Sequence, residues 1–304
     1  MTSAPSSANP FPGPLPTPMA QPLPAAGPVG IVGLGLIGGS LGLDLQRCGL
    51  EVRGLVHRQT TAVRAQQRGL AQRVGTDPAL LADCAVVVLA LPLDRLLDPD
   101  PALLAALPRQ AVITDVGSVK QPVLQRWQAL HPRFVASHPM AGTAEAGVEA
   151  GVEGLFQGRP WVATPTAATD PTALAVVQAL AGAVGAHWLC CSAPDHDQAV
   201  ALISHLPVLV SAALLQAADR AADGELAGLV RALASSGFAD TTRVGGGNPE
   251  LGTLMARCNR GPLLAALASY RQQLEGLERR LQQADWVGLG ADLEGCRASR
   301  PDFL

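Results

Sequence analysis

Short apolar runs alternate with helical stretches between Val29 and about Cys191. The runs are continuous and rich in Val, Ile, Leu and Ala: "VGIVGLG", "EVRGLVH", "CAVVVLALP", "AVITDVGS", "RFVASHP" and "WVATPT". Strands covered on both faces have this composition, and alternation of strands with helices is typical of a doubly wound sheet. The pattern predicts an α/β domain with a mainly parallel sheet over residues 28–192.

Only helical patterns follow Pro194, in "DQAVALISHLPVLVSAALLQAADRA", "ELAGLVRALASS" and "PLLAALASYRQQLEGLERRLQQADW". The last has an apolar stripe formed by Leu263, Leu264, Leu267, Leu274, Leu277 and Leu281. Such a stripe packs in a core or against a partner helix. We therefore expect an all-helical domain over residues 193–304, and a homodimer formed through it.

The first 27 residues differ from the rest, with eight prolines and no charged residue. They lack the basic segment and the continuous apolar segment of a secretory signal. A disordered, proline-rich tail over residues 1–27 is the expected structure.

Composition excludes several classes of protein. With 48% apolar and 15% charged residues the chain is globular, and a net charge of −3 provides no basic surface for nucleic acid or an anionic membrane. No uninterrupted apolar run reaches the roughly 18 residues of a membrane span. The six cysteines form no C-x-x-C pair and no metal-ligand spacing, so we expect no metal, reduced thiols and a cytoplasmic location.

The segment "GLGLIGG" fits the dinucleotide motif G-x-G-x-x-G with Gly33, Gly35 and Gly38. It follows a strand and begins a helix, as the motif requires. Gly33 would allow a tight turn, Gly35 close approach of a pyrophosphate, and Gly38 close packing of helix and strand. Leu36 and Ile37 would add N–H groups at the helix N-terminus. The motif predicts a Rossmann-type fold with a bound dinucleotide.

The end of the second strand indicates which dinucleotide is bound. NAD sites commonly place an acidic residue there, but the only acid nearby, Glu51, lies at the other end of this strand. His57 and Arg58 stand in its place, and a guanidinium suits a 2′-phosphate. We expect NADP, with NAD as the alternative and Pro92 as a further cofactor contact; Arg58 as a merely solvated strand end is the competing interpretation.

Two strands carry polar residues at their carboxyl ends, where ligands bind in open α/β sheets. One provides Asp115, Ser118 and Lys120, and the other His138 and Thr143. We expect both groups to face the nicotinamide side of the cleft. Histidine suits a general base near neutral pH, although a structural histidine is the alternative for His138.

The helical region contains a second candidate site. Asn248, Pro249 and Glu250 predict a strong helix start, shortly after Arg243. A helix N-terminus beside a guanidinium would bind a carboxylate, whereas a surface ion pair is the alternative role for Arg243. His196 and His205 are each more often structural when taken alone.

Together these motifs resemble the prephenate/arogenate dehydrogenase family. The resemblance lies in "GLGLIGGSL", "TDVGSVK", "SHPMAGT", "DHDQAVALISHLP" and "SSGFADTTRVGGGNPELG", which occur in the family's order. It implies oxidative decarboxylation of a cyclohexadienol, with hydride transfer to the nicotinamide and loss of CO₂. His138 would accept the hydroxyl proton or its hydrogen bond, and Ser118 would help orient that histidine or the hydroxyl. Arg243 would hold a substrate carboxylate, with His205 and Thr143 lining the side-chain end of the pocket.

The "VHRQ" segment and the missing acid resemble the NADP-linked, arogenate-using branch of the family. Arogenate is therefore the expected substrate and prephenate the alternative. The ammonium of arogenate would favour a nearby acidic side chain, and Asp197 and Asp240 are the two candidates to bind it. A different NADP-linked oxidoreductase, or a non-catalytic NADP-sensing module, stays open. The sensing module has no need of Ser118, His138 and Arg243 together.

Overall fold

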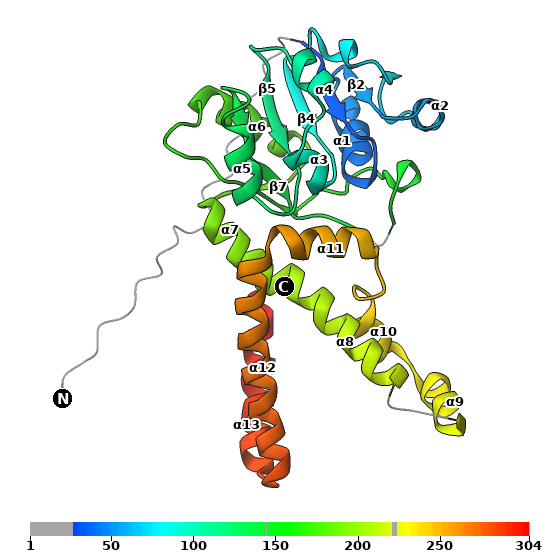
Figure 1. The fold of residues 1–304 in the computed structure, drawn as a ribbon, viewed down its shortest axis with the longest axis vertical. Helices are drawn as coiled ribbons and strands as arrows, with labels where there is room; N and C mark the ends of the chain where they lie inside the picture. Colours follow the sequence, from blue (N-terminus) through cyan, green and yellow to red (C-terminus); the bar gives the residue numbers. More distant parts are fainter. Residues whose placement is uncertain (1–26, 144, 221–223, 304) are drawn as a thin grey trace, which may run out of the picture.

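The computed structural model describes residues 27–303 except 144 and 221–223, so the expected tail lies outside the described residues but for Gly27. A six-stranded sheet forms the centre of the N-terminal half (Figure 1). Every neighbouring pair in it is parallel. In spatial order its strands are β3 (Arg73–Gly75), β2 (Val52–Leu55), β1 (Val29–Val32), β4 (Val86–Leu89), β5 (Val112–Asp115) and β6 (Phe134–Val135). The predicted α/β, Rossmann-type fold class is confirmed.

Helices cover both faces of this sheet. Because side chains alternate along a strand, Val86 and Val88 of β4 belong to one apolar core, and Val87 and Leu89 to the other. The first core includes residues of α1 (Leu36–Arg47), α2 (Gln59–Gln67) and α6 (Pro171–Ala183). The second includes residues of η1 (Pro78–Leu81), α3 (Leu93–Leu97), α4 (Pro101–Ala106) and α5 (Gln121–Trp127).

A second sheet corrects the prediction that "RFVASHP" and "WVATPT" are each one strand of the parallel sheet. It contains β7 (Ser137–Pro139), β8 (Pro160–Ala163) and β9 (His187–Cys190), with β7 and β8 antiparallel. The run divides at Ala136 because Ser137 is held by the end of β5. Its N–H donates to Asp115 Oδ1 at 3.1 Å and its hydroxyl donates to the Asp115 carbonyl at 2.9 Å.

The C-terminal half is helical, as expected. Figure 1 shows two arms that diverge below the sheets, one formed by α8 to α10 and the other by α12 and α13. Its elements are α7 (Ala193–Val200), a π-turn (Ala201–His205), α8 (Leu206–Arg220), α9 (Gly224–Leu233), α10 (Ser236–Thr242), α11 (Pro249–Cys258), α12 (Arg260–Gln282) and α13 (Trp286–Ser299). Two short 3₁₀ turns, Val148–Ala150 and Arg300–Phe303, complete the described elements.

The arms expose much of their apolar surface. The stripe on α12 buries Leu263, whereas Leu264, Leu274 and Leu281 are each more than half exposed. The stripe therefore contributes to the core at one end of α12 and leaves part of its apolar surface exposed farther along the helix.

One described helical stretch, Ala193–Arg220, is long and apolar enough to cross a membrane by length and composition alone. The sequence analysis found no uninterrupted apolar run of that length, because polar residues interrupt this one. His196, Asp197 and His205 lie within the stretch and are buried in contacts with other elements. These contacts identify it as a helix that joins the two halves of a folded protein.

A buried ion pair ties β5 to β7. The Lys120 ammonium contacts Asp115 and also donates to the Ser137 carbonyl at 2.6 Å, and both charged side chains are fully buried. Burial raises the pKa of Asp115 and lowers that of Lys120, so each charge depends on its partner. The expectation that these side chains face the cleft is wrong, because both point into the junction between the sheets.

We expect Lys120→Met to destabilise the protein by about 3–5 kcal/mol, because it leaves the Asp115 carboxylate buried without its counter-charge. Urea unfolding measures the effect. The control is Arg126→Met, since Arg126 is an exposed base on the adjacent α5. Equal stability of the two variants would contradict the assigned role of Lys120.

Candidate active site

The glycine loop has the geometry expected of a dinucleotide-binding turn. Gly33 has φ +94°, and a Cβ there would lie 2.3 Å from the Ala90 carbonyl oxygen. A Cβ on Gly38 would lie 1.9 Å from the Gly33 carbonyl oxygen. Any larger side chain at either position would therefore displace backbone.

Gly35 differs, because a Cβ on it would meet no protein atom within 4 Å. It is the N-cap of α1, where no side chain caps the helix and no acid lies in the first turn. The first N–H groups of the helix, which include those of Leu36 and Ile37, are therefore available beside open space. Such a helix start binds a phosphate group.

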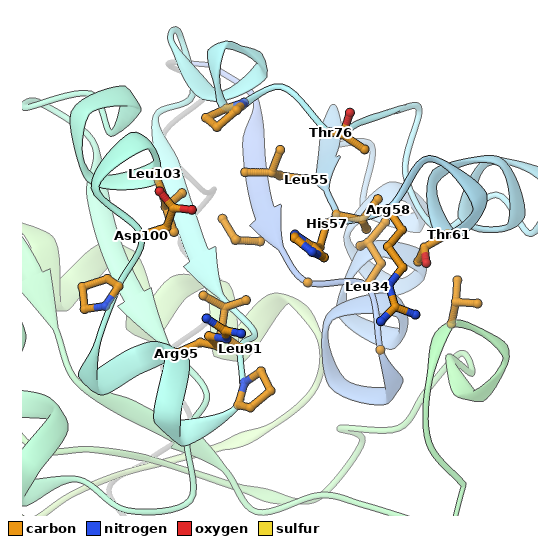
Figure 2. A pocket seen from close by; sticks show the side chains of 18 of the residues that line it. Leu34, Leu55, His57, Arg58, Thr61, Thr76, Leu91, Arg95, Asp100 and Leu103 are labelled. Atoms are coloured by element: carbon orange, nitrogen blue, oxygen red, sulfur yellow. The ribbon is translucent and has the colours of Figure 1, made fainter.

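A cavity of about 760 Å³ adjoins this loop. Figure 2 shows His57, Arg58 and Thr61 on one wall, where β2 leads into α2. Pro92 and Arg95 belong to the opposite wall, where β4 leads into α3. His57, Arg58 and Pro92, the expected cofactor contacts, therefore line one cavity together with Gly33 and Gly35. Arg95 was missed, although its place just after the fourth strand of the pattern was available as a signal.

His138 lies in β7 and is 9% exposed. Its Nδ1 lies 3.0 Å from Nε2 of His196, on α7. Burial lowers the pKa of His138 well below the usual value, and the nearby His196, Lys120 and His205 lower it further. The ring is therefore neutral near pH 7 and is able to accept a proton.

Two residues whose link to His138 could not be read from the sequence, His196 and Asp197, hold this histidine. Nδ1 of His196 lies 2.8 Å from Asp197 Oδ1. The Asp197 carboxylate accepts from the Lys120 N–H at 2.7 Å and from the Gln121 N–H at 2.9 Å. Both of its oxygens are engaged, so Asp197 is not free to bind a substrate ammonium. The "DHD" motif contains both residues, but their contact with His138 spans the two halves of the chain.

His205 is also buried and joins the same network. The Asn259 side-chain amide donates to His205 Nδ1 at 3.0 Å and to the Asp197 carbonyl at 2.7 Å. Burial lowers the pKa of His205 to about 4. This histidine is therefore neutral and carries its proton on Nε2. Asn259 at the start of α12 is a further residue that sequence reasoning missed.

The remaining expected residues are less closely joined to His138. Ser118 is half-buried in the β5–α5 loop, and Thr143 is exposed on the loop after β7. Arg243 is exposed at the end of α10, and the following loop packs on α8 through a 2.7 Å bond from the Gly245 N–H to Ser211 Oγ. Among the described contacts none joins these three side chains to His138.

The predicted helix start at Asn248 is present. Its side chain accepts from the N–H groups of Glu250 at 2.9 Å and Leu251 at 3.3 Å. The cap therefore occupies the N–H groups that were expected to bind a substrate carboxylate. Of the two expected carboxylate-binding groups, only the Arg243 guanidinium is left.

Comparison with known proteins identifies the family. Residues 41–190 match the prephenate dehydrogenase nucleotide-binding domain, and residues 192–294 match the prephenate dehydrogenase dimerization domain. Cyclohexadienyl dehydrogenase of Zymomonas mobilis is 30% identical over 84% of this chain and 89% of its own. The chain belongs to the prephenate dehydrogenase family.

Solved members of the family have the same fold. Synechocystis arogenate dehydrogenase is 42% identical, with a TM-score of 0.75 over 91% of this chain and 99% of its own. Prephenate dehydrogenase of Aquifex aeolicus, solved with hydroxyphenyl propionate and NAD+, is 27% identical, with a TM-score of 0.85 over 91% of this chain and 98% of its own. This member of the prephenate dehydrogenase family is therefore an oxidoreductase that uses a nicotinamide dinucleotide.

We expect Gly35→Ala to weaken dinucleotide binding at least tenfold without destabilising the fold. The added methyl group meets no protein atom, and alanine accommodates the Gly35 backbone angle φ of −80°, but the methyl group occupies the space beside the helix N-terminus. Calorimetric titration with NADP+ and NAD+ measures the affinity, and thermal unfolding measures stability. Unchanged affinity for both cofactors would remove the loop from the site.

Proposed function

We propose that this enzyme catalyses the NADP-dependent oxidative decarboxylation of arogenate to tyrosine. The proposal rests mainly on the position of His138. This histidine is buried and neutral, and it lies where the nucleotide-binding half meets α7 of the helical half. The geometry supports a base that acts on a substrate held between the halves.

A nicotinamide dinucleotide held by the glycine loop and Arg58 would supply the oxidising step as the acceptor of the carbinol hydride. His138 Nε2 accepts the hydroxyl proton as the carbonyl character of that carbon develops. The ring carboxylate then leaves as CO₂, and its electron pair passes through the ring to the oxygen. The proton returns to that oxygen, which gives the phenol, and aromatisation drives the step.

Positive charge at the end of β2 supports NADP over NAD. Arg58 and His57 line the cavity where the adenosine ribose of a bound dinucleotide would lie. Arg58 is exposed, and its side chain extends beside Thr61 in Figure 2. A guanidinium near a hydroxyl provides the donors that a 2′-phosphate needs.

Sequence similarity supports arogenate over prephenate. Identity is 42% to the Synechocystis arogenate dehydrogenase and 27% to the Aquifex aeolicus prephenate dehydrogenase over similar lengths. Since Asp197 is engaged, the proposal assigns Asp240, an exposed acid on α10, to the substrate ammonium. Arg243, three residues later, would bind a carboxylate of the substrate.

Ser118, Thr143 and His205 complete the proposed site. Ser118 would orient the substrate hydroxyl, Thr143 would close the side-chain end of the pocket, and His205 would donate through Nε2. The Nε2 atom of His205 is buried and has no hydrogen-bond partner among the described residues, which supports a role toward a bound acceptor.

We also propose a cytoplasmic homodimer. The match to the dimerization domain and the exposed leucines of α12 support the dimer. The six cysteines are free, as is typical of a reducing compartment.

Initial rates at 340 nm test the function, with arogenate or prephenate paired with NADP+ or NAD+. Turnover confined to arogenate with NADP+ is expected. Turnover of prephenate would replace the proposal with the prephenate dehydrogenase alternative. No turnover in any of the four pairs, with folded protein that binds NADP+, would refute both the arogenate and the prephenate dehydrogenase activity.

We expect His138→Asn to lower kcat at least 100-fold, because a positioned general base contributes about 10²–10⁴-fold. Affinity for NADP+ should stay within twofold, since His138 does not line the cofactor cavity. Steady-state kinetics and cofactor titration measure the two effects. Retained turnover would exclude His138 as the base.

Arg58→Ala should weaken NADP+ binding about tenfold or more and leave NAD+ binding nearly unchanged, because only NADP+ carries the 2′-phosphate. Dissociation constants for both cofactors measure the difference. Arg109→Ala is the matched control, since Arg109 is exposed and precedes the amino end of β5, whereas Arg58 follows the carboxyl end of β2. Equal weakening of both cofactors would show that Arg58 does not read the phosphate.

A further inference from the structure

A chain of buried hydrogen bonds begins at Nδ1 of His138, the proposed base. It runs from His138 Nδ1 to His196 Nε2 at 3.0 Å, and from His196 Nδ1 to Asp197 Oδ1 at 2.8 Å. His196 is 3% exposed and Asp197 is 2% exposed. Water therefore does not compete for these bonds, and each donor and acceptor in the chain must be satisfied within it.

Asp197 is fixed at the far end of the chain. Its two oxygens accept backbone N–H groups of Lys120 and Gln121, where the β5–α5 loop enters α5. Its own carbonyl accepts from the Asn259 amide at the start of α12. The Asp197 carboxylate thus belongs to α7 of the helical half and is held by backbone N–H groups of the nucleotide-binding half.

With both imidazole rings neutral, this arrangement allows one pattern of protons. A carboxylate has no proton to donate, so His196 must donate from Nδ1 and keep a lone pair on Nε2. His138 must then donate from Nδ1 to that lone pair. The lone pair of His138 is left on Nε2, the ring atom opposite the chain.

We propose that His196 and Asp197 are positioning residues that fix the tautomer of His138 and make Nε2 its proton-accepting atom. The inference rests on the proposed role of His138 as the base. In the reaction, a proton taken up at Nε2 gives an imidazolium whose Nδ1–H bond to His196 strengthens. The pair thus holds the base ready before the reaction and stabilises its charge during it.

Asp197→Asn is the sharpest test, because it reverses the pattern at its origin. With the amide oxygen kept on the Gln121 N–H and the NH₂ in the place of Oδ1, His196 Nδ1 accepts from the NH₂, and His196 then donates from Nε2 to His138 Nδ1. His138 would carry its proton on Nε2, where the substrate hydroxyl must be accepted. The corresponding change in the chymotrypsin triad lowers kcat about 10⁴-fold, and we expect a loss on the order of 10³-fold or more here.

The tautomer is observable without turnover. Full-length protein labelled with ¹⁵N-histidine gives imidazole shifts that separate protonated from bare nitrogens, and His138→Asn assigns the His138 signals. We expect bare Nε2 in the unaltered enzyme and bare Nδ1 in Asp197→Asn. A His138 with bare Nδ1 in the unaltered enzyme would overturn the proposal even if every kinetic prediction held.

Two variants at His196 keep the test decisive if Asp197→Asn fails to fold. His196→Gln retains an acceptor for His138 and a donor for Asp197, so kcat should stay within about tenfold. His196→Leu removes both and should lower kcat at least 100-fold, with KM for NADP+ unchanged. His187→Gln, an exposed histidine on β9, is the control and should have no effect.

Equal kcat for His196→Gln, His196→Leu and the unaltered enzyme would overturn the positioning role. Retained activity in His138→Asn is a different failure, because it removes the base itself. The kinetics of His138→Asn therefore test the proposed function. The ¹⁵N shifts and the difference in kcat between His196→Gln and His196→Leu test the positioning role of His196 and Asp197.

Discussion

Lys120 is the residue on which the junction between the two halves depends. Its ammonium compensates the Asp115 carboxylate at the end of β5 and holds the Ser137 carbonyl on β7. Its backbone N–H donates to Asp197 on α7. A buried charge without a partner costs several kcal/mol, so β5 and β7 cannot separate locally without a large penalty, and the backbone bond to Asp197 joins α7 to them. Since His138 follows Ser137 directly, the same residue fixes the base in space.

The helical half is stabilised differently. Its own buried core is small, formed by Ala201, Leu206, Leu263 and Ala266. Large exposed apolar surfaces mark interaction sites, and those on α8, α9 and α12 lie within the segment that matches the dimerization domain. Because α7 continues through the π-turn into α8, the helix that carries His196 is continuous with one of the two exposed arms.

Features set by local sterics could be predicted from the sequence. The glycine loop, the Asn248 cap and the change from strands to helices near Pro194 each follow from a few neighbouring residues. The division between β6 and β7 could not, because it depends on Asp115, more than twenty residues earlier. Asp115 and Lys120 were assigned to the cleft because a polar residue at a strand end has the same pattern whether it faces a ligand or a neighbouring sheet. The contact of His138 with His196 was missed because it requires the docking of both halves.

The order of groups behind the base also has an electrostatic reason. His196 stands between Asp197 and His138, so the carboxylate does not contact the base directly. Burial is the main cause that lowers the pKa of His138, and the neighbouring His196 and Lys120 lower it further. The base is thereby oriented by a carboxylate without being protonated by it. The buried Lys120–Asp115 ion pair stabilises the fold, and His196 transmits the orientation set by Asp197 to His138. His138 is therefore a neutral proton acceptor where the nucleotide-binding half meets the helical half.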